Sequence, residues 1–173
     1  MMVEVRPETT ADIREIHQVN VLAFGQENEA KLVDALSKSN SFVPELSLVA
    51  VKRSSIVGHI LFTRIKIIDI SGNAFNSLAL APMSVRPGMQ RKGIGSQLIT
   101  SGLKKAKQLG FTSVIVLGHE HYYPRFGFLP ANKWNIKAHF DVPSNVFMAL
   151  ELIHGILENV SGTVKYSKEF EDV

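Results

Sequence analysis

The feature that most constrains the fold is a glycine-rich loop between an apolar run and an amphipathic run. Residues 77–85 are mostly apolar, and residues 86–95 read Arg-Pro-Gly-Met-Gln-Arg-Lys-Gly-Ile-Gly. Residues 94–109 then show the apolar period of a helix, and Gly110 is placed to end it. Residues 112–117 are rich in β-branched side chains, as buried strands are. The order strand, loop, helix, strand predicts a βαβ unit whose two strands are parallel neighbours.

Two further helices are expected near the start of the chain. Thr9 and Asp12 have the spacing of a partial capping box that begins the first of them. The second covers about residues 29–36. The side chains expected to pack inward are Ile13, Ile16 and Phe24 in the first helix, Leu32, Val33 and Leu36 in the second, and Leu98, Gly102, Ala106 and Leu109 in the helix after the glycine loop.

Several other segments have the composition of strands. They are residues 46–52, 56–66, 64–70, 134–138, 146–152 and 162–166. The first two are separated by residues 53–55 and predict a hairpin. Pro82 removes a ladder donor from the run 77–85, so it marks an edge, a bulge or a splayed strand end. Residues 122–126 predict one helical turn. The whole pattern predicts an α+β fold, with a mixed sheet and helices on its faces.

Composition limits the class of protein. The length of 173 residues suits one domain, 1–173, and the absence of cysteine excludes disulfides and a cysteine nucleophile. No apolar run approaches the roughly 20 residues that span a bilayer, and the first residues lack a secretory signal. We therefore expect a cytoplasmic protein without membrane contact. The net charge of +3 is too small to indicate a nucleic acid partner.

The glycine loop has the features of a phosphate site, because the first N–H groups of a helix lack partners and glycine admits an anion closely. Gly88 and Gly93 have the first spacing of a nucleotide P-loop, but Ile94 and Gly95 stand where Lys and Ser or Thr are required. A dinucleotide fingerprint needs a third glycine where Leu98 stands. Both comparisons argue against an ordinary NTPase and against NAD.

Three linked elements carry a resemblance to a known family. The loop contains Gln90-x-x-Gly93-x-Gly95, and residues 123–128 read Tyr-Pro-Arg-Phe-Gly-Phe. Together with the strand residues 80–87, these resemble the signatures of the GNAT superfamily of N-acetyltransferases. Residues 57–62 and 162–166 also resemble its YhbS-like bacterial branch. The resemblance implies a mostly antiparallel central sheet with a splayed parallel strand pair and helices on both faces.

The resemblance also implies a reaction. Acetyl-coenzyme A would be the co-substrate, and a primary amine of unknown identity would attack the acetyl group directly in a ternary complex. The pantetheine arm would pair with the strand 77–85, and the diphosphate would lie on the loop. The residues expected to bind it are Met83, Ser84, Val85, Gln90, Arg91, Lys92, Gly93, Ile94, Gly95 and Ser96.

The resemblance assigns Tyr123 as the acid that protonates the departing thiolate. The general base stays open, because the strand 77–85 carries no carboxylate. Glu120 is the first candidate. His119, His121, His59 and a chain of water molecules are the others. The spacing of the sequence His-Glu-His at residues 119–121 does not favour a metal site, and none is expected.

This chain departs from the family pattern before the tyrosine. Many members have an asparagine about seven residues earlier, where this chain has Val116, and the connection 118–122 is short. Two alternatives to an enzyme remain open. One is a non-catalytic acyl-coenzyme A sensor of the same fold. The other is a basic module that binds RNA or acidic proteins through Lys104, Lys105 and Lys107. An exposed strand edge would also permit a homodimer.

Overall fold

The computed structural model describes residues 2–172, and of residue 172 only the backbone. The chain forms two compact units. Unit 1 comprises residues 2–63, 81–105 and 168–172, and unit 2 comprises residues 64–80 and 106–167. The long strands β3 (Ser55–Ile68) and β4 (Ala74–Val85) and the helix α3 (Ile94–Gln108) each contribute residues to both units.

Unit 1 contains one edge of the sheet and the first two helices. Its other elements are β1 (Glu4–Pro7), the 3-10 turn Thr10–Asp12, α1 (Ile13–Phe24), α2 (Asn28–Leu36), β2 (Phe42–Lys52) and the 3-10 turn Lys168–Asp172. β1 pairs with β2 and β2 with β3, both antiparallel. β4 is the next strand, and the N–H of Arg86 just after it donates to the Val57 carbonyl at 2.8 Å.

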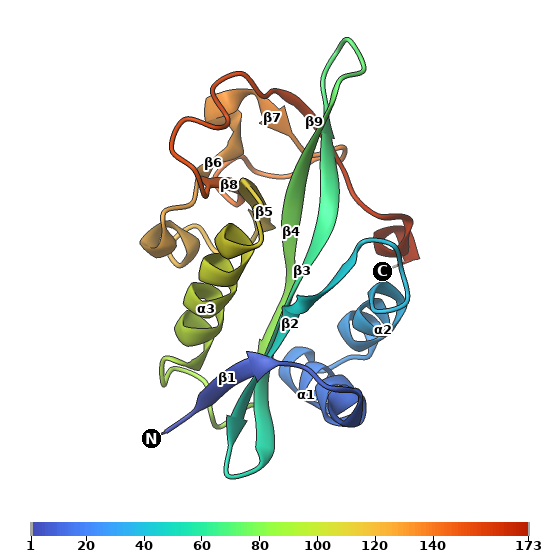
Figure 1. The fold of residues 1–173 in the computed structure, drawn as a ribbon, viewed down its shortest axis with the longest axis vertical. Coiled ribbons are helices and arrows are strands. Elements are labelled where there is room, and N and C mark those ends of the chain that lie inside the picture. The colour runs from blue at the N-terminus through green and yellow to red at the C-terminus, as the bar shows by residue number, and fades with distance from the viewer. Residues whose placement is uncertain (1, 173) are drawn as a thin grey trace. The chain divides into compact units, whose positions relative to one another are not determined.

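The hairpin of β2 and β3 confirms the sequence prediction, with a turn one residue shorter than expected. Arg53 and Ser54 occupy the turn and have φ angles of +49° and +66°. Two consecutive residues with positive φ form the turn that matches the twist of paired strands. Figure 1 shows this hairpin, with its turn at the end nearest the N-terminus label.

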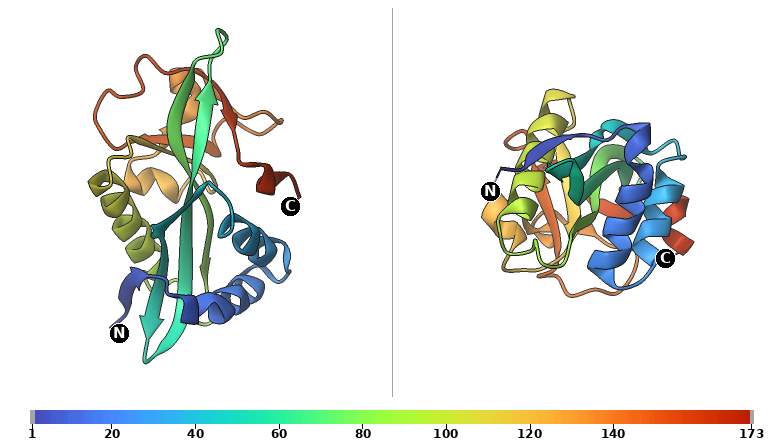
Figure 2. Two further views of the ribbon diagram at one scale, coloured as in Figure 1. Left: turned by 45° about the vertical axis from the view of Figure 1, so that its right-hand side comes forward. Right: turned by 90° about the horizontal axis from the view of Figure 1, so that it is seen from below.

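Adjacent residues of β3 show that helices cover both faces of the sheet in unit 1. A Cβ on Gly58 would come within 3.1 Å of Leu98 and 3.2 Å of Ile94, so this face packs on α3. The side chain of His59, which points to the other face, contacts Asn20 of α1. Figure 2 shows α1 and α2 side by side, as the first view does. Their apolar side chains form a core with β2 and β3 made of Ile16, Val19, Leu32, Val33, Leu36, Val49, Ile56 and Leu61.

The predicted packing of the helices is confirmed for α2 and only in part for α1 and α3. Ile13 is 52% exposed and Phe24 39% exposed, because they are the first and last residues of α1 and the buried stripe lies between them. Leu109 is 38% exposed because α3 ends at Gln108, and Gly110 turns the chain away with a φ of +90°. The Thr9 N–H donates to Asp12 Oδ2 at 2.7 Å, so the predicted capping box is present, although it opens a 3-10 turn.

Unit 2 contains the parallel strand pair. Leu78 of β4 lies opposite Val114 of β5 (Ser113–Leu117), and Ala79 lies opposite Ile115. β5 pairs antiparallel with β8 (Phe147–Glu151), which also pairs with β6 (Leu129–Pro130). The sequence therefore predicted the parallel pair correctly, whereas the two-residue strand β6 was missed.

A second parallel pair was not expected. β9 (Gly162–Lys165) pairs antiparallel with the end of β3 and parallel with β7 (Ile136–Lys137). Two 3-10 turns complete the unit: η2 (Tyr123–Phe126), which confirms the predicted helical turn, and η3 (Ala131–Trp134). Over residues 2–172, no helix is both long and apolar enough to cross a membrane.

Candidate active site

The glycine loop of unit 1 has a backbone shape suited to an anion. Gly88, Arg91 and Gly93 have φ angles of +84°, +61° and +84°. Alternation of left-handed and right-handed residues turns successive N–H groups toward one side, which is how backbone concavities bind anions. α3 begins directly afterwards at Ile94, so the positive end of its dipole adds to the same region. The loop therefore has the backbone features predicted from its sequence.

Space at the loop is also open. A Cβ on Gly93 would meet no atom within 4 Å, so the glycine is required by its φ and not by crowding. The open side leaves room for a ligand to approach the backbone. Arg91 and Lys92 are exposed and would add positive charge. Arg91 adopts a positive φ although it has a side chain, a conformation that costs about 1–2 kcal/mol.

Two polar side chains near the loop are used to hold it. The Nε2 of Gln90 donates to the Val85 carbonyl at 3.1 Å. The Nε of Arg86 donates to the Ile56 carbonyl on β3 at 2.8 Å, which anchors this guanidinium to the sheet. The first contact fixes the loop against the end of β4, and the second fixes it against β3. Sequence reasoning missed both contacts, because the contact of Arg86 depends on the register of a strand 30 residues away and the contact of Gln90 depends on the exact path of an irregular loop.

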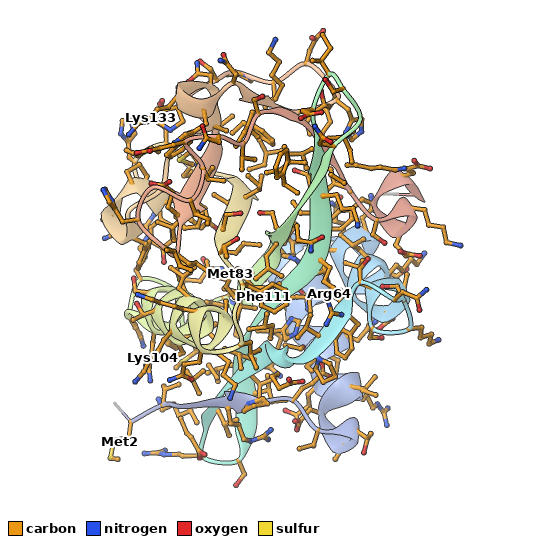
Figure 3. All side chains as sticks on the ribbon, turned by 45° about the horizontal axis from the view of Figure 1, so that its top comes forward. Met2, Arg64, Met83, Lys104, Phe111 and Lys133 are labelled. Carbon is orange, nitrogen blue, oxygen red and sulfur yellow. The ribbon has the colours of Figure 1, made fainter. Side chains whose placement is uncertain are left out.

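The end of β4 alternates between buried and partly exposed side chains. Pro82 and Ser84 are buried, whereas Met83 and Val85 are partly exposed. The Ser84 hydroxyl is buried and has no hydrogen-bond partner among the described residues. Met83 and Val85 therefore face the more open side of the strand, and any role of Ser84 toward a ligand there falls to its backbone. Figure 3 shows Met83 on this strand.

Tyr123 lies in unit 2, in the 3-10 turn η2. Its side chain is buried, with a residue exposure of 8%. The rings of Tyr122 and Phe128 meet it edge to face, with centroids 5.3 and 5.7 Å away. Burial, with a smaller contribution from Tyr122, raises the pKa of Tyr123 to about 12. The phenol is therefore protonated at neutral pH, as an acid must be before it donates.

Glu120 lies in the connection between β5 and η2, also in unit 2. Its carboxylate accepts a hydrogen bond from the side-chain amide of Asn145. The Nε2 of His121 is 3.4 Å from the other carboxylate oxygen, and the His121 side chain is 92% exposed. Glu120 is thus held in place yet partly open to solvent. The contact with Asn145 was missed because nothing local in the sequence joins residues 25 positions apart.

His59 is the candidate that the structure places in the core. It is fully buried, its Nε2 lies 2.9 Å from the Ser47 hydroxyl, and its Nδ1 lies 3.4 Å from the Asn20 amide. Burial lowers the pKa of His59 to about 3. A neutral ring with polar neighbours at both nitrogens and no solvent exposure has the environment of a structural histidine.

Two other sequence expectations concern metals and the basic helix face. Among residues 2–172, no cluster of three His, Asp or Glu side chains could hold a metal ion. Lys104, labelled in Figure 3, and Lys107 are exposed on α3, and Lys105 is partly buried. In unit 2, the Arg64 guanidinium lies 5.9 Å from the centre of the Phe111 ring, and both residues are labelled in Figure 3.

Comparisons with known proteins identify the family of the chain. The family model described as the acetyltransferase (GNAT) family matches residues 13–128. A protein of Escherichia coli K12 named as the uncharacterized N-acetyltransferase YjhQ is 42% identical over 122 residues, which are 69% of this chain and 66% of that protein. The match thus spans slightly less than two thirds of YjhQ. The uncharacterized N-acetyltransferase YhbS of the same strain is 28% identical over 167 residues, 96% of this chain and 97% of YhbS.

Two solved structures extend the comparison. The GNAT family N-acetyltransferase YhbS of Escherichia coli, in complex with CoA, superposes with a TM-score of 0.89 at 26% identity, over 98% of this chain and 92% of that one. A GNAT family acetyltransferase of Brucella melitensis, in complex with acetyl-CoA, gives 0.79 at 30% identity, over 98% of both chains. The family match covers more than half of the chain, and it includes both the glycine loop and the Tyr123 turn. This chain therefore belongs to the GNAT family of acetyltransferases, among relatives of the YhbS type.

Proposed function

We propose that this chain, acting as one domain over residues 1–173, transfers the acetyl group of acetyl-coenzyme A to a primary amine. The observation that carries the proposal is the loop at Gly93, whose positive φ and open side fit a diphosphate at the start of α3. The relatives crystallised with CoA and acetyl-CoA support the choice of ligand.

The cofactor would be held by backbone and charge. The N–H groups of residues 91–96 would bind the diphosphate, and Arg91 and Lys92 would add Coulomb attraction. The pantetheine amides would pair with the backbone of Met83 and Val85, in the manner of an added strand. The partly exposed side of β4 at these two residues supports this arrangement.

The reaction would be a direct transfer. The neutral amine nitrogen attacks the thioester carbon, a backbone N–H near Met83 stabilises the oxyanion, and the C–S bond then breaks. The thiolate leaves with a proton from the Tyr123 hydroxyl. Because the pKa of Tyr123 is raised to about 12, above the value of about 8.5 for a thiol, the phenol is protonated before the transfer, and the phenolate left behind regains a proton from solvent as the base releases the proton that it took from the amine.

A base must remove a proton from the amine, since a free alkylamine has a pKa around 10.4. Glu120 is our first choice, because its carboxylate is held by Asn145 and still partly open to solvent. Water is the alternative. His59 is set aside, because it is fully buried and its pKa is lowered to about 3.

The test is turnover. Purified protein is incubated with acetyl-coenzyme A and a panel of primary amines, the release of CoA thiol is followed optically, and each product is identified by mass spectrometry. The proposal predicts that thiol release depends on the amine and yields an acetylated product. A protein that binds acetyl-coenzyme A but acetylates no amine in the panel would favour the non-catalytic sensor instead.

A further inference from the structure

Gly118 begins the short connection that joins β5 to η2. Its N–H donates to the Val146 carbonyl at 2.9 Å. At the far end, the N–H groups of Tyr122 and Tyr123 both donate to the His119 carbonyl, at 3.1 and 3.3 Å. The connection is therefore held by backbone hydrogen bonds at its start and at its end, which limits how far Tyr123 can move.

The ring of Tyr123 lies directly against the backbone of Gly118. A Cβ on Gly118 would overlap Cε2 of the ring and would stand 2.8 Å from Cδ2, closer than real side chains approach. The φ of Gly118 is not among the positive values of this chain, so the backbone conformation does not demand glycine. Glycine is required here because the Tyr123 ring occupies the space that a side chain of any size at residue 118 would need.

Two other rings complete the surroundings of the Tyr123 ring, which together with Gly118 we call its seat. Tyr122 and Phe128 both present edge-to-face contacts, with interplanar angles of 82° and 78°. Contact with Gly118, Tyr122 and Phe128 leaves the Tyr123 residue only 8% exposed. Protein interiors are closely packed, so a displacement of the Tyr123 ring would also disturb the side chains around it.

We propose that Gly118 is a positioning residue for the reaction: by lacking a side chain it seats the Tyr123 ring and so fixes where the phenol hydroxyl delivers its proton. The inference rests on the proposed function, in which Tyr123 is the acid. It gives this chain a local device for placing the tyrosine. The short connection 118–122 keeps Gly118 close to the ring, since few residues separate the strand from the turn.

The size of the effect follows from geometry. An acid must lie within about 2.6–3.2 Å of the atom it protonates. A methyl group at residue 118 would push the ring by on the order of 1 Å, and a misplacement of that size costs about 10²-fold in rate. Gly118→Ala should therefore lower kcat about as much as Tyr123→Phe does, while the KM for acetyl-coenzyme A stays nearly unchanged.

The first test needs neither cofactor nor acceptor. Phenolate absorbance is titrated in the wild-type protein, Gly118→Ala, Tyr123→Phe and the double variant. The wild-type curve minus the Tyr123→Phe curve gives the titration of Tyr123 beside glycine, and the Gly118→Ala curve minus that of the double variant gives it beside alanine. With a pKa near 12, about one tenth of Tyr123 is ionised at pH 11, and a ring displaced toward water approaches the nine tenths expected for a pKa near 10. Circular dichroism at the same pH verifies folding. An unchanged Tyr123 titration in Gly118→Ala would overturn the seat.

Gly102→Ala is the matched control. Its new Cβ would likewise collide with an aromatic ring, that of Phe62 in unit 1. It should cost stability and leave the Tyr123 titration where it is in the wild type. If Gly118→Ala does not fold, Tyr123→Ala combined with Gly118→Ala decides the matter. The proposal predicts that this pair folds as well as Tyr123→Ala alone, because the ring that collides is gone, and a pair that still fails to fold contradicts it.

The second test connects the seat to catalysis. Thiol release from acetyl-coenzyme A is measured with n-butylamine as the acceptor probe, in the same four proteins. We expect Gly118→Ala to add no further loss of kcat in the Tyr123→Phe background. Full additivity of the two losses would overturn the positioning role. Failure of the proposed function is distinguishable, because then the wild-type protein releases no thiol, whether or not it binds acetyl-coenzyme A, whereas the phenolate titration keeps its outcome.

Discussion

The side-chain amide of Gln90 donates a hydrogen bond to the Val85 carbonyl, with Nε2 and O separated by 3.1 Å. This contact ties the glycine loop to the last residue of β4, the strand proposed to pair with pantetheine. The Gln90 side chain therefore holds the loop against the strand, and we expect it to affect cofactor affinity through the position of the loop.

Gln90→Ala should weaken acetyl-coenzyme A binding by about fivefold, since one exposed hydrogen bond contributes on the order of 1 kcal/mol. Isothermal titration measures the change. Gln97→Ala is the control, because the Gln97 amide makes the same kind of contact, to the Val3 carbonyl at 3.0 Å. Tighter binding in Gln90→Ala would show that the side chain competes with pantetheine for the Val85 carbonyl.

Tyr123→Phe should keep the affinity for acetyl-coenzyme A and lower turnover about 10²-fold, the usual scale for one acid–base group. Phenylalanine preserves the ring that Tyr122 and Phe128 contact and removes only the hydroxyl. Steady-state kinetics with the best amine of the panel provide the measurement. Unchanged turnover would remove Tyr123 from the mechanism.

Glu120→Gln distinguishes between the two candidates for the general base, the Glu120 carboxylate and water. Glutamine can still accept the hydrogen bond from Asn145, so the connection should stay in place while the carboxylate is lost. If Glu120 is the base, kcat should fall by about 10²-fold or more at neutral pH, and the loss should shrink as pH rises toward the pKa of the amine. A change of less than about twofold would assign the proton to water.

His59 should make the protein sensitive to mild acid. Its pKa is about 3 in the folded state against an ordinary value near 6.5, so the unfolded chain binds the proton first. The free energy of unfolding has its full value above pH 6.5. It decreases as the pH falls from 6.5 toward 3, by up to about 1.4 kcal/mol per pH unit. Urea unfolding at several pH values measures this slope.

Other groups act in different windows, which makes the His59 slope separable. Asp12, whose pKa is lowered to about 2 mainly by Arg6, loses its contribution only below pH 3.8. Glu8, whose pKa is raised by burial, acts near its ordinary value of 4.5 and with the opposite sign. His59→Gln should flatten the slope between pH 6.5 and 5. A slope that persists in this variant would locate the acid sensitivity elsewhere.

The local signals in the sequence predicted the parts of the fold that depend on near neighbours. The glycine loop, the helix after it and the hairpin at Arg53 and Ser54 are all encoded within a few residues, and the structure confirms them. The exposure of Ile13 and Phe24 was predicted wrongly, because apolar period alone cannot say where a helix ends against its neighbours.

The parts that the sequence did not predict depend on distant pairing. β6 is two residues long and exists only because β8 lies beside it. β7, also two residues long, lies within the expected strand 134–138, but its parallel pairing with β9 was not predicted. In the candidate site, the contacts of Asn145 with Glu120 and of Arg86 with Ile56 join residues far apart in the chain. The close approach of Tyr123 to Gly118 leaves no pattern in the sequence either, although the two residues are only five positions apart.

The most direct test of the account is isothermal titration with acetyl-coenzyme A of the wild-type protein, Gly93→Glu and Gly110→Glu. Both glycines have a positive φ, of +84° and +90°, and open space at the Cβ position, so the backbone strain of the two variants is matched. Only Gly93 lies in the proposed diphosphate loop. The account predicts micromolar binding that is lost in Gly93→Glu and kept in Gly110→Glu. Absence of binding to the folded wild-type protein, or equal binding by both variants, would contradict it.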